Sequence, residues 1–272
     1  MSFSATEERK QPQIEVGGLR SLSWAVRDTL VMTKRNLIRY VRVPQLLVFS
    51  TVQPIIFVLL FAYVFGGAIE TPGVDYINFL IPGILVQTVL FGATQATVGL
   101  AEDLSGGMVD RFRSLPMARL AVLAGRTLAD SVRNFFVVLI MIGVGYLIGF
   151  RFQDGLLSAA LAVALVVLFG YAFTWISVLV GLFAKDPESA QVAGFIWVFP
   201  LVFASSAFVP VESMPGWLEA FAEVQPVSVV VDAARVLTLG GSTDVVWWAL
   251  AWIAGITAVF APLAVARYRQ ST

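Results

Sequence analysis

The sequence of 272 residues contains no cysteine and no histidine. The chain can therefore form no disulfide, and it has no thiolate or imidazole to bind a metal or a haem. A cysteine nucleophile and a Ser-His-Asp triad are excluded for the same reason. Basic and acidic residues number 18 each, so the net charge is zero and the chain lacks the basic footprint of a nucleic-acid-binding protein.

Charged residues are also scarce, at 13% of the chain against 58% hydrophobic residues. Six stretches of 17 to 30 residues carry no charge at all. A helix needs roughly 20 apolar residues to cross a hydrocarbon core. The third stretch is short, but Arg133 and Arg151 at its edges could extend their head groups to the interfaces. We therefore predict an all-α polytopic membrane protein whose six transmembrane helices run about 45–67, 78–101, 134–150, 156–184, 189–210 and 245–266.

The placement of lysine and arginine predicts the orientation of these spans. With the N-terminus in the cytoplasm, 16 of the 18 basic residues lie inside, and Arg151 and Arg235 lie outside. Basic loops stay on the cytoplasmic side, so we expect both termini in the cytoplasm and the chain in the plasma membrane. The expected organisation is a disordered tail (1–20), an amphipathic helix (21–43), a transmembrane domain (44–266) and a cytoplasmic tail (267–272).

The segment 21–43 has the periodicity of a helix with one apolar and one basic face. Its apolar face carries Leu22, Val26, Leu30, Leu37, Tyr40 and Val41. A basic amphipathic helix of this kind lies in the membrane interface, so we expect an interfacial elbow helix. The alternative is a solvated helix that supplies topogenic charge and nothing more.

The largest cytoplasmic loop, 102–133, contains a short amphipathic stretch. Gly106 and Gly107 permit a sharp turn, and Pro116 disfavours helix at the residue before it. A short cytosolic helix with an apolar stripe suggests a protein partner, although it could also pack on the protein's own elbow helix. The residues expected at this contact are Gly107, Met108, Arg111, Phe112, Leu115 and Pro116.

The external segment 210–244 predicts two short helices, about 214–223 and 226–238. Both are too short to cross a bilayer. Trp217, Phe221 and the valines between 227 and 231 are too apolar for an ordinary exposed loop. We expect re-entrant helices that enter the outer leaflet before the last span.

Several classes of function require residues that this sequence lacks. The six predicted spans contain no ionisable group to serve as the relay of an ion-driven carrier, and no aspartate pair for an intramembrane hydrolase. No G-x-x-x-x-G-K-[ST] loop exists to bind a nucleotide. The chain is therefore expected to have no enzymatic chemistry or cofactor of its own. If it moves a solute against a gradient, a partner supplies the energy; a channel remains an alternative.

Three groups of residues, in their order and spacing, resemble the ABC-2 type permeases, the membrane subunits of ATP-binding cassette (ABC) exporters, and above all the daunorubicin-resistance permeases. The groups are DRFRSLP (110–116) with Gly125-Arg126 and Asp130; KDPESAQ (185–191); and 199–210 with MPGW (214–217), QPVS (225–228) and Ala234-Arg235. The resemblance covers about residues 20–270. It implies a coupling helix between spans two and three, separate P-loop ATPase subunits that bind ATP and Mg²⁺, and a second permease copy, identical or related.

The resemblance and the uncharged, aromatic-rich spans lead us to expect export of hydrophobic or amphiphilic drugs or lipids. The alternatives are a lipid or polysaccharide exporter of the same superfamily and an ATP-independent channel or carrier. Gln87 and Gln95, eight residues apart, share a helix face with Phe91. Uncharged polar side chains also serve as contacts between helices. The candidate transport-path residues are Gln53, Gln87, Gln95, Thr174 and Ser205.

The predicted orientation can be tested with introduced cysteines, because the chain has none of its own. In sealed, right-side-out cells, a cysteine at Glu219 should react with a membrane-impermeant thiol reagent, and a cysteine at Arg119 should react only after the cells are opened. Labelling of position 119 in sealed cells would rule out the six-span arrangement.

Overall fold

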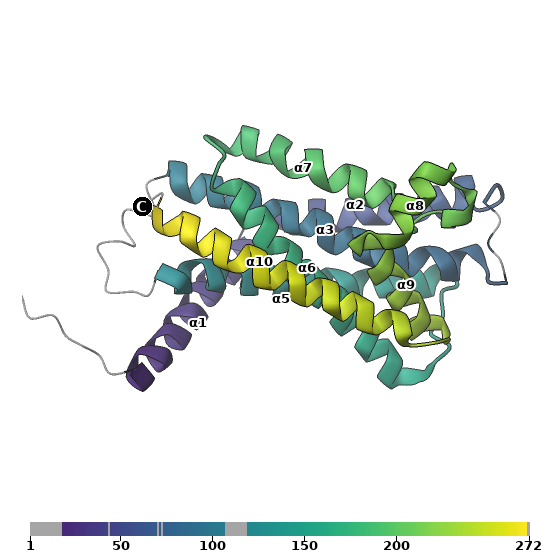
Figure 1. Ribbon diagram of the computed structural model, residues 1–272, viewed down its shortest axis with the longest axis horizontal. Coiled ribbons are helices and arrows are strands. Elements are labelled where there is room, and N and C mark those ends of the chain that lie inside the picture. The colour runs from purple at the N-terminus through teal and green to yellow at the C-terminus, as the bar shows by residue number, and fades with distance from the viewer. Residues whose placement is uncertain (1–17, 43, 70, 72, 107–118, 271–272) are drawn as a thin grey trace, which may run out of the picture.

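The computed structural model describes residues 18–42, 44–69, 71, 73–106 and 119–270, and this part of the chain is helical, without a strand. The long helices lie along one axis of the molecule, and α1 (Gly18–Arg42) lies across one end of it (Figure 1). The predicted all-α class is therefore confirmed for the described residues. The other helices are α2 (Pro44–Leu59), its π-helical continuation η1 (Leu60–Phe65), α3 (Tyr76–Ser105), α5 (Arg119–Ile148), α6 (Gly155–Gly181), α7 (Pro187–Phe203), the 3₁₀ turn η2 (Val211–Ser213), α8 (Gly216–Val224), α9 (Pro226–Leu239) and α10 (Asp244–Gln270).

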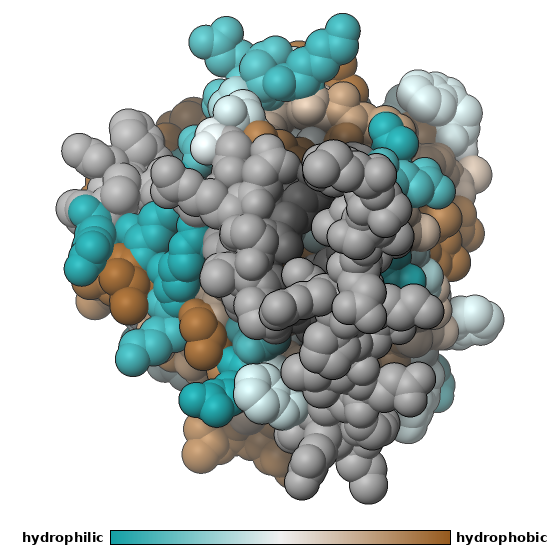
Figure 2. All heavy atoms as spheres, turned by 90° about the vertical axis from the view of Figure 1, so that its left-hand side faces the viewer, coloured by the Kyte–Doolittle hydropathy of each residue, from teal (hydrophilic) through white to brown (hydrophobic). Residues whose placement is uncertain are grey.

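Four of the described helices, α3, α5, α6 and α10, are long and apolar enough to cross a membrane. The α2–η1 segment and α7 are shorter apolar helices. Large apolar side chains face outward, including Leu147, Leu156 and Trp247, each more than 70% exposed. Hydrophilic side chains instead gather at the end of the molecule near α1 (Figure 2). Apolar flanks with a polar end are what a bilayer requires of a helical bundle.

Helix α3 forms the centre of the bundle. About 83% of its most apolar stretch is buried, and it packs against α2, α5, α6, α7 and α9. Its side chains Leu80, Ile84 and Leu90 are fully buried in one core with Phe169 and Phe173 of α6. Because α3 touches five other helices, its surface decides how each of them is placed.

The third predicted span differs from the structure. Helix α5 begins at Arg119, well before the predicted start at residue 134, and Arg133 lies within it. The expectation that Arg133 reaches the interface is wrong, since the residue is 4% exposed. Its charge is paired inside the bundle, so the helix continues through it. Arg151 is exposed, and its Nη1 donates hydrogen bonds of 2.7 Å to the carbonyls of Tyr146 and Phe150.

The end of the bundle opposite α1 is closed by short helices. Helices α8 and α9 have 9 and 14 residues, and α9 packs against α3, α6 and α10. Gly240 ends α9 with a φ of 93°, a left-handed conformation that favours glycine. Helix α7 stops at Phe203, and a turn then leads from it toward α8. The two short helices predicted from the sequence are therefore present, and α9 lies against the core.

One close contact holds this end to α3. A Cβ atom at Gly83 would lie 2.0 Å from the carbonyl oxygen of Ala207, whereas a Cβ at Gly143 of α5 would meet nothing within 4 Å. Small residues at such crossings let helices and turns approach closely.

We expect Gly83→Ala to destabilise the protein by about 1–3 kcal/mol, the usual cost of overpacking. The matched control Gly143→Ala should be neutral or stabilising by up to about 1 kcal/mol, because alanine favours helix over glycine. The midpoint of thermal unfolding in detergent measures both effects. A Gly83→Ala variant as stable as Gly143→Ala would contradict the close contact.

Candidate functional site

A cleft of about 600 Å³ lies between α2, α3 and α7. Four glutamines from these three helices line it, together with the aromatic rings of Phe57, Phe91 and Phe195. No charged side chain lines the cleft among the residues that the structure describes. The glutamines are Gln53 of α2, Gln87 and Gln95 of α3, and Gln191 of α7.

The structure brings three of the five predicted transport-path residues together in this cleft. Gln87 and Gln95 line it on either side of Phe91, as their spacing predicts, and Gln53 of α2 joins them. Thr174 lies elsewhere: it is fully buried in α6, and its hydroxyl donates to the carbonyl of Gly170 at 2.8 Å. Ser205 is buried in the turn after α7.

The predicted coupling residues lie outside the described part of the chain. They are Gly107, Met108, Arg111, Phe112, Leu115 and Pro116.

Sequence reasoning missed the contribution of α7 to the cleft. Gln191 and Phe195 are four residues apart, so they share one face of this helix. The same two residues also line an open groove of about 520 Å³ along α7, which is otherwise apolar. The sequence did contain a signal for this contribution, because the spacing of Gln191 and Phe195 repeats that of Gln87 and Phe91 on α3. Three exposed side chains of this groove are Val192, Ile196 and Phe199.

A second polar site lies where α1 meets α3 and α5. Arg133 of α5 is buried and lies 3.6 Å from Asp130, and the hydroxyl of Tyr40 of α1 donates to Asp130. Burial raises the pKa of Tyr40 to about 12, so the hydroxyl stays protonated. Nη1 of Arg126 on α5 lies 2.5 Å from Oδ2 of Asp103, near the C-terminal end of α3. Sequence reasoning treated these arginines as loop charges that set orientation, because sequence spacing does not reveal partners on other helices.

Glycines of α3 make room for both arginines. A Cβ atom at Gly99 would lie 1.8 Å from Nη2 of Arg126, and a Cβ at Gly92 would lie 3.3 Å from Nη2 of Arg133. The two glycines are seven residues apart, and so are the two arginines, in the opposite chain direction. Helices α3 and α5 are therefore antiparallel here, with one arginine against each glycine. A small cavity of about 80 Å³ beside them is lined by both arginines and by Gln95, which also lines the cleft.

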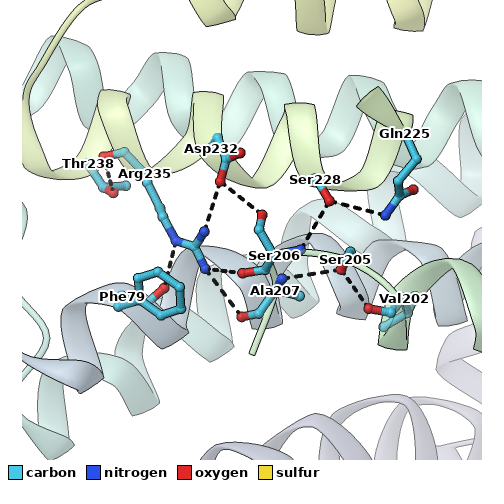
Figure 3. Close-up of polar contacts among 10 residues, drawn as sticks. All are labelled: Phe79, Val202, Ser205, Ser206, Ala207, Gln225, Ser228, Asp232, Arg235 and Thr238. Atoms are coloured by element: carbon cyan, nitrogen blue, oxygen red, sulfur yellow. Dashed lines mark hydrogen bonds and ion pairs between the residues drawn. The ribbon is translucent and has the colours of Figure 1, made fainter. Parts of the chain in front are cut away.

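A third polar cluster fixes the opposite end of the bundle (Figure 3). The guanidinium of Arg235 on α9 donates to the carbonyls of Phe79 and Ser206, and it pairs with Asp232 at 2.9 Å. Ser206 also donates from its hydroxyl to Asp232 at 2.9 Å.

Gln225, at the start of α9, extends the same cluster. Its amide nitrogen donates to the carbonyl of Leu201 at 3.1 Å and to the hydroxyl of Ser228 at 3.2 Å. The bonds of this cluster hold α9 against α3, the end of α7 and the turn after α7. They therefore fix α3 and α7, two of the helices that line the cleft, at this end of the bundle.

The lining of the cleft determines which ligands it can recognise. Its lining offers amide groups and aromatic faces, and the described residues contain no group of acidic side chains that could hold a metal ion. Such a lining suits ligands with a large apolar surface and a few hydrogen-bonding groups. The amide oxygen of Gln87 is buried without a hydrogen-bond partner among the described residues.

Comparisons with known proteins agree on one family. The family model of the ABC-2 type transporter matches residues 27–239. The chain is 36% identical to the daunorubicin resistance ABC transporter permease protein DrrB1 of Streptomyces coeruleorubidus, over 90% of this chain and 87% of the other. It is 32% identical to the probable doxorubicin resistance ABC transporter permease protein DrrC of Mycobacterium tuberculosis, over 91% and 90%.

A more distant relative is the probable multidrug ABC transporter permease YbhR of Escherichia coli, at 24% identity over 73% of this chain and 54% of the other. The family match spans most of the chain, and its apolar helices are those of an integral membrane protein. On this evidence the chain belongs to the ABC-2 type transporter family, whose members are the membrane subunits that work with an ABC ATPase.

Proposed function

We propose that this chain is the permease subunit of an ABC exporter that moves hydrophobic or amphiphilic compounds outward, with ATP hydrolysed by a separate subunit. The observation that carries the proposal is the uncharged cleft of about 600 Å³ between α2, α3 and α7. It offers four glutamines among phenylalanines, which suits an amphiphile better than a sugar polymer that needs many hydrogen bonds. The relatives named for daunorubicin and doxorubicin resistance support the same cargo class.

The transmembrane arrangement that we propose has six spans. Beyond α3, α5, α6 and α10, the 16 residues of α2 continue into the 6 of η1, and together they reach the roughly 20 residues needed to cross the bilayer. Helix α7 supplies 17 residues and ends at the short external helices. Both termini would then lie in the cytoplasm, and α8 and α9 would be re-entrant at the outer face.

Helix α1 would be the interfacial elbow of this arrangement. Val26, Leu30 and Val41 are each more than half exposed, although they are apolar, and Met32 faces α5 from the other side. An exposed apolar stripe beside basic residues suits the boundary between lipid tails and headgroups.

The assembly would contain two kinds of partner. ATPase subunits would bind ATP and Mg²⁺ and would dock at the coupling residues between 107 and 116. A second permease copy, identical or related, would cover the apolar groove along α7, whose Val192 and Ile196 are more than 60% exposed. An ATP-independent carrier is less well supported, because the described residues of the cleft include no titratable group to couple an ion.

The cargo class can be tested on the permease co-purified with its ATPase. Daunorubicin, the amphiphile named by a relative, should stimulate ATP hydrolysis, and hydrophilic oligosaccharides should not. Gln191→Trp should weaken the response to daunorubicin by roughly tenfold, or about 1.4 kcal/mol, because the indole fills the cleft. The matched control Leu147→Trp places the same ring on the exposed surface of α5 and should respond normally. Stimulation by oligosaccharides alone would overturn the proposed cargo.

Energy coupling can be tested separately at Arg111. If this residue contacts an acidic surface of the ATPase, Arg111→Glu replaces attraction with repulsion and should weaken association by roughly tenfold or more. The permease should still reach the membrane at normal levels, since the residue precedes α5 in the cytoplasmic loop. Arg151→Glu, the same change on the external side, is the control. An Arg111→Glu variant that binds its ATPase and transports normally would reduce Arg111 to a topogenic charge.

A further inference from the structure

The side chain of Arg133 joins three helices, although it is only 2% exposed. From α5 its Nη2 donates to the carbonyl of Gly92 on α3 at 2.7 Å, and its Nη1 donates to the hydroxyl of Tyr40 on α1 at 3.2 Å. Asp130, one turn earlier on α5, lies 3.6 Å from the same guanidinium. A guanidinium is suited to this task because its donors point in several fixed directions.

Tyr40 is the residue that brings α1 into this cluster. Its hydroxyl donates to Asp130 and accepts from Arg133, and its ring lies 5.0 Å from the guanidinium carbon. One oxygen of Asp130 and the Nε of Arg133 are buried without a partner among the described residues. The two charged groups are thus already incompletely satisfied, and moving α1 away from α5 would remove further hydrogen bonds from them.

The same cluster touches the wall of the cleft. Gly92, which accepts the hydrogen bond from Arg133, is one of the residues that line the cleft. A Cβ atom at Gly92 would lie 2.4 Å from Oδ1 of Asn134, which also accepts from Arg133 at 3.2 Å. The wall is thus packed directly on the Arg133 cluster, and a shift of that side chain requires α3 to adjust.

The other side of the cluster leads to the cytoplasmic loop. This loop leaves α3 after Ser105 and enters α5 at Arg119. Two ion pairs tie these flanks to each other and to α1: Arg126 of α5 with Asp103 of α3, and Arg39 of α1 with Glu102 of α3. A displacement at the loop would reach the ends of α3, α5 and α1 together.

We propose that Tyr40 and Arg133 are positioning residues that transmit movement of α1 and α5 to the cleft wall at Gly92, and so link ATP hydrolysis to cargo movement. The proposal rests on the proposed function of the cleft. In this proposal α1 has a second role besides lying in the interface: its Tyr40 holds Arg133, and Arg133 in turn bonds to the cleft wall at Gly92. Coupling between two sites is carried by chains of packed side chains and hydrogen bonds, and this cluster forms such a chain from α1 to the cleft wall.

The decisive variant is Tyr40→Phe, which removes the hydroxyl and keeps the ring on the guanidinium. In the permease–ATPase complex, binding of daunorubicin and basal ATP hydrolysis should stay as in the wild type. Stimulation of ATP hydrolysis by daunorubicin should fall by roughly fivefold, in the range found for mutations along coupling networks. The matched control is Tyr63→Phe in η1, where the tyrosine is 69% exposed, and it should leave stimulation unchanged.

Arg133→Lys gives an independent measurement, because lysine keeps the charge but cannot reach Gly92 and Tyr40 at once. If the two residues act as one link, the double variant should lose little more stimulation than either single variant. Purely additive losses would overturn the proposal, as would normal stimulation in Tyr40→Phe. Failure of Arg133→Lys to accumulate, together with normal coupling in Tyr40→Phe, would also overturn it and leave a structural cluster.

These outcomes are distinct from failure of the proposed function. If the wild-type complex shows neither daunorubicin binding nor stimulation, the cargo assignment fails. Stimulation of ATP hydrolysis by oligosaccharides or by lipid vesicles then distinguishes a polysaccharide exporter from a lipid exporter. If the wild type responds and Tyr40→Phe responds equally, the cleft retains its role and the Tyr40–Arg133 link alone is refuted.

Discussion

A polar group within a hydrocarbon layer must find its partners inside the protein, and this constraint explains where the polar residues of the chain lie. The arginines Arg133 and Arg235, which are largely enclosed, each donate to at least one backbone carbonyl and pair with a carboxylate. They stand near opposite ends of the bundle, on α5 and α9. Between them, the amide oxygen of Gln87 has no partner among the described residues, and its residue lines the cleft. Gln87 therefore offers an acceptor to a ligand that enters the cleft.

Helix α3 connects these three places. Its residue Phe79 accepts from Arg235, its Gln87 and Gln95 line the cleft, and its Gly92 accepts from Arg133. It is also the most enclosed of the four membrane-spanning candidates. A helix so enclosed is placed by its protein neighbours, so the positions of α5 and α9 bear on the cleft through their contacts with α3. This placement is a physical reason to look for coupling in the bundle interior.

The sequence predicts the architecture well because charge-free length is a local property. Four predicted spans overlap α3, α5, α6 and α10, which are long and apolar enough to cross a membrane, although α5 begins well before residue 134. The two short helices predicted after α7 are present as α8 and α9. Local pattern also places Gln87 and Gln95 on one face. It could not show that Gln191 joins them from α7, or that Ser205 lies in a turn. Nor could it show that the hydroxyl of Thr174 is bonded to a carbonyl of its own helix, α6. Those facts depend on which helices become neighbours, and a single sequence carries no direct signal of that.

The buried arginines show the same limit in sharper form. By sequence alone, Arg126 and Arg133 are cytoplasmic charges that orient the chain, and that role is compatible with the structure. Their second role depends on Gly99 and Gly92, which leave space on α3 at the same seven-residue interval. Since α3 and α5 run in opposite directions, the matching intervals place both arginines against glycines in one register. A shift by a single residue would drive each guanidinium against a neighbouring side chain, so these two arginines fix how α3 and α5 pack.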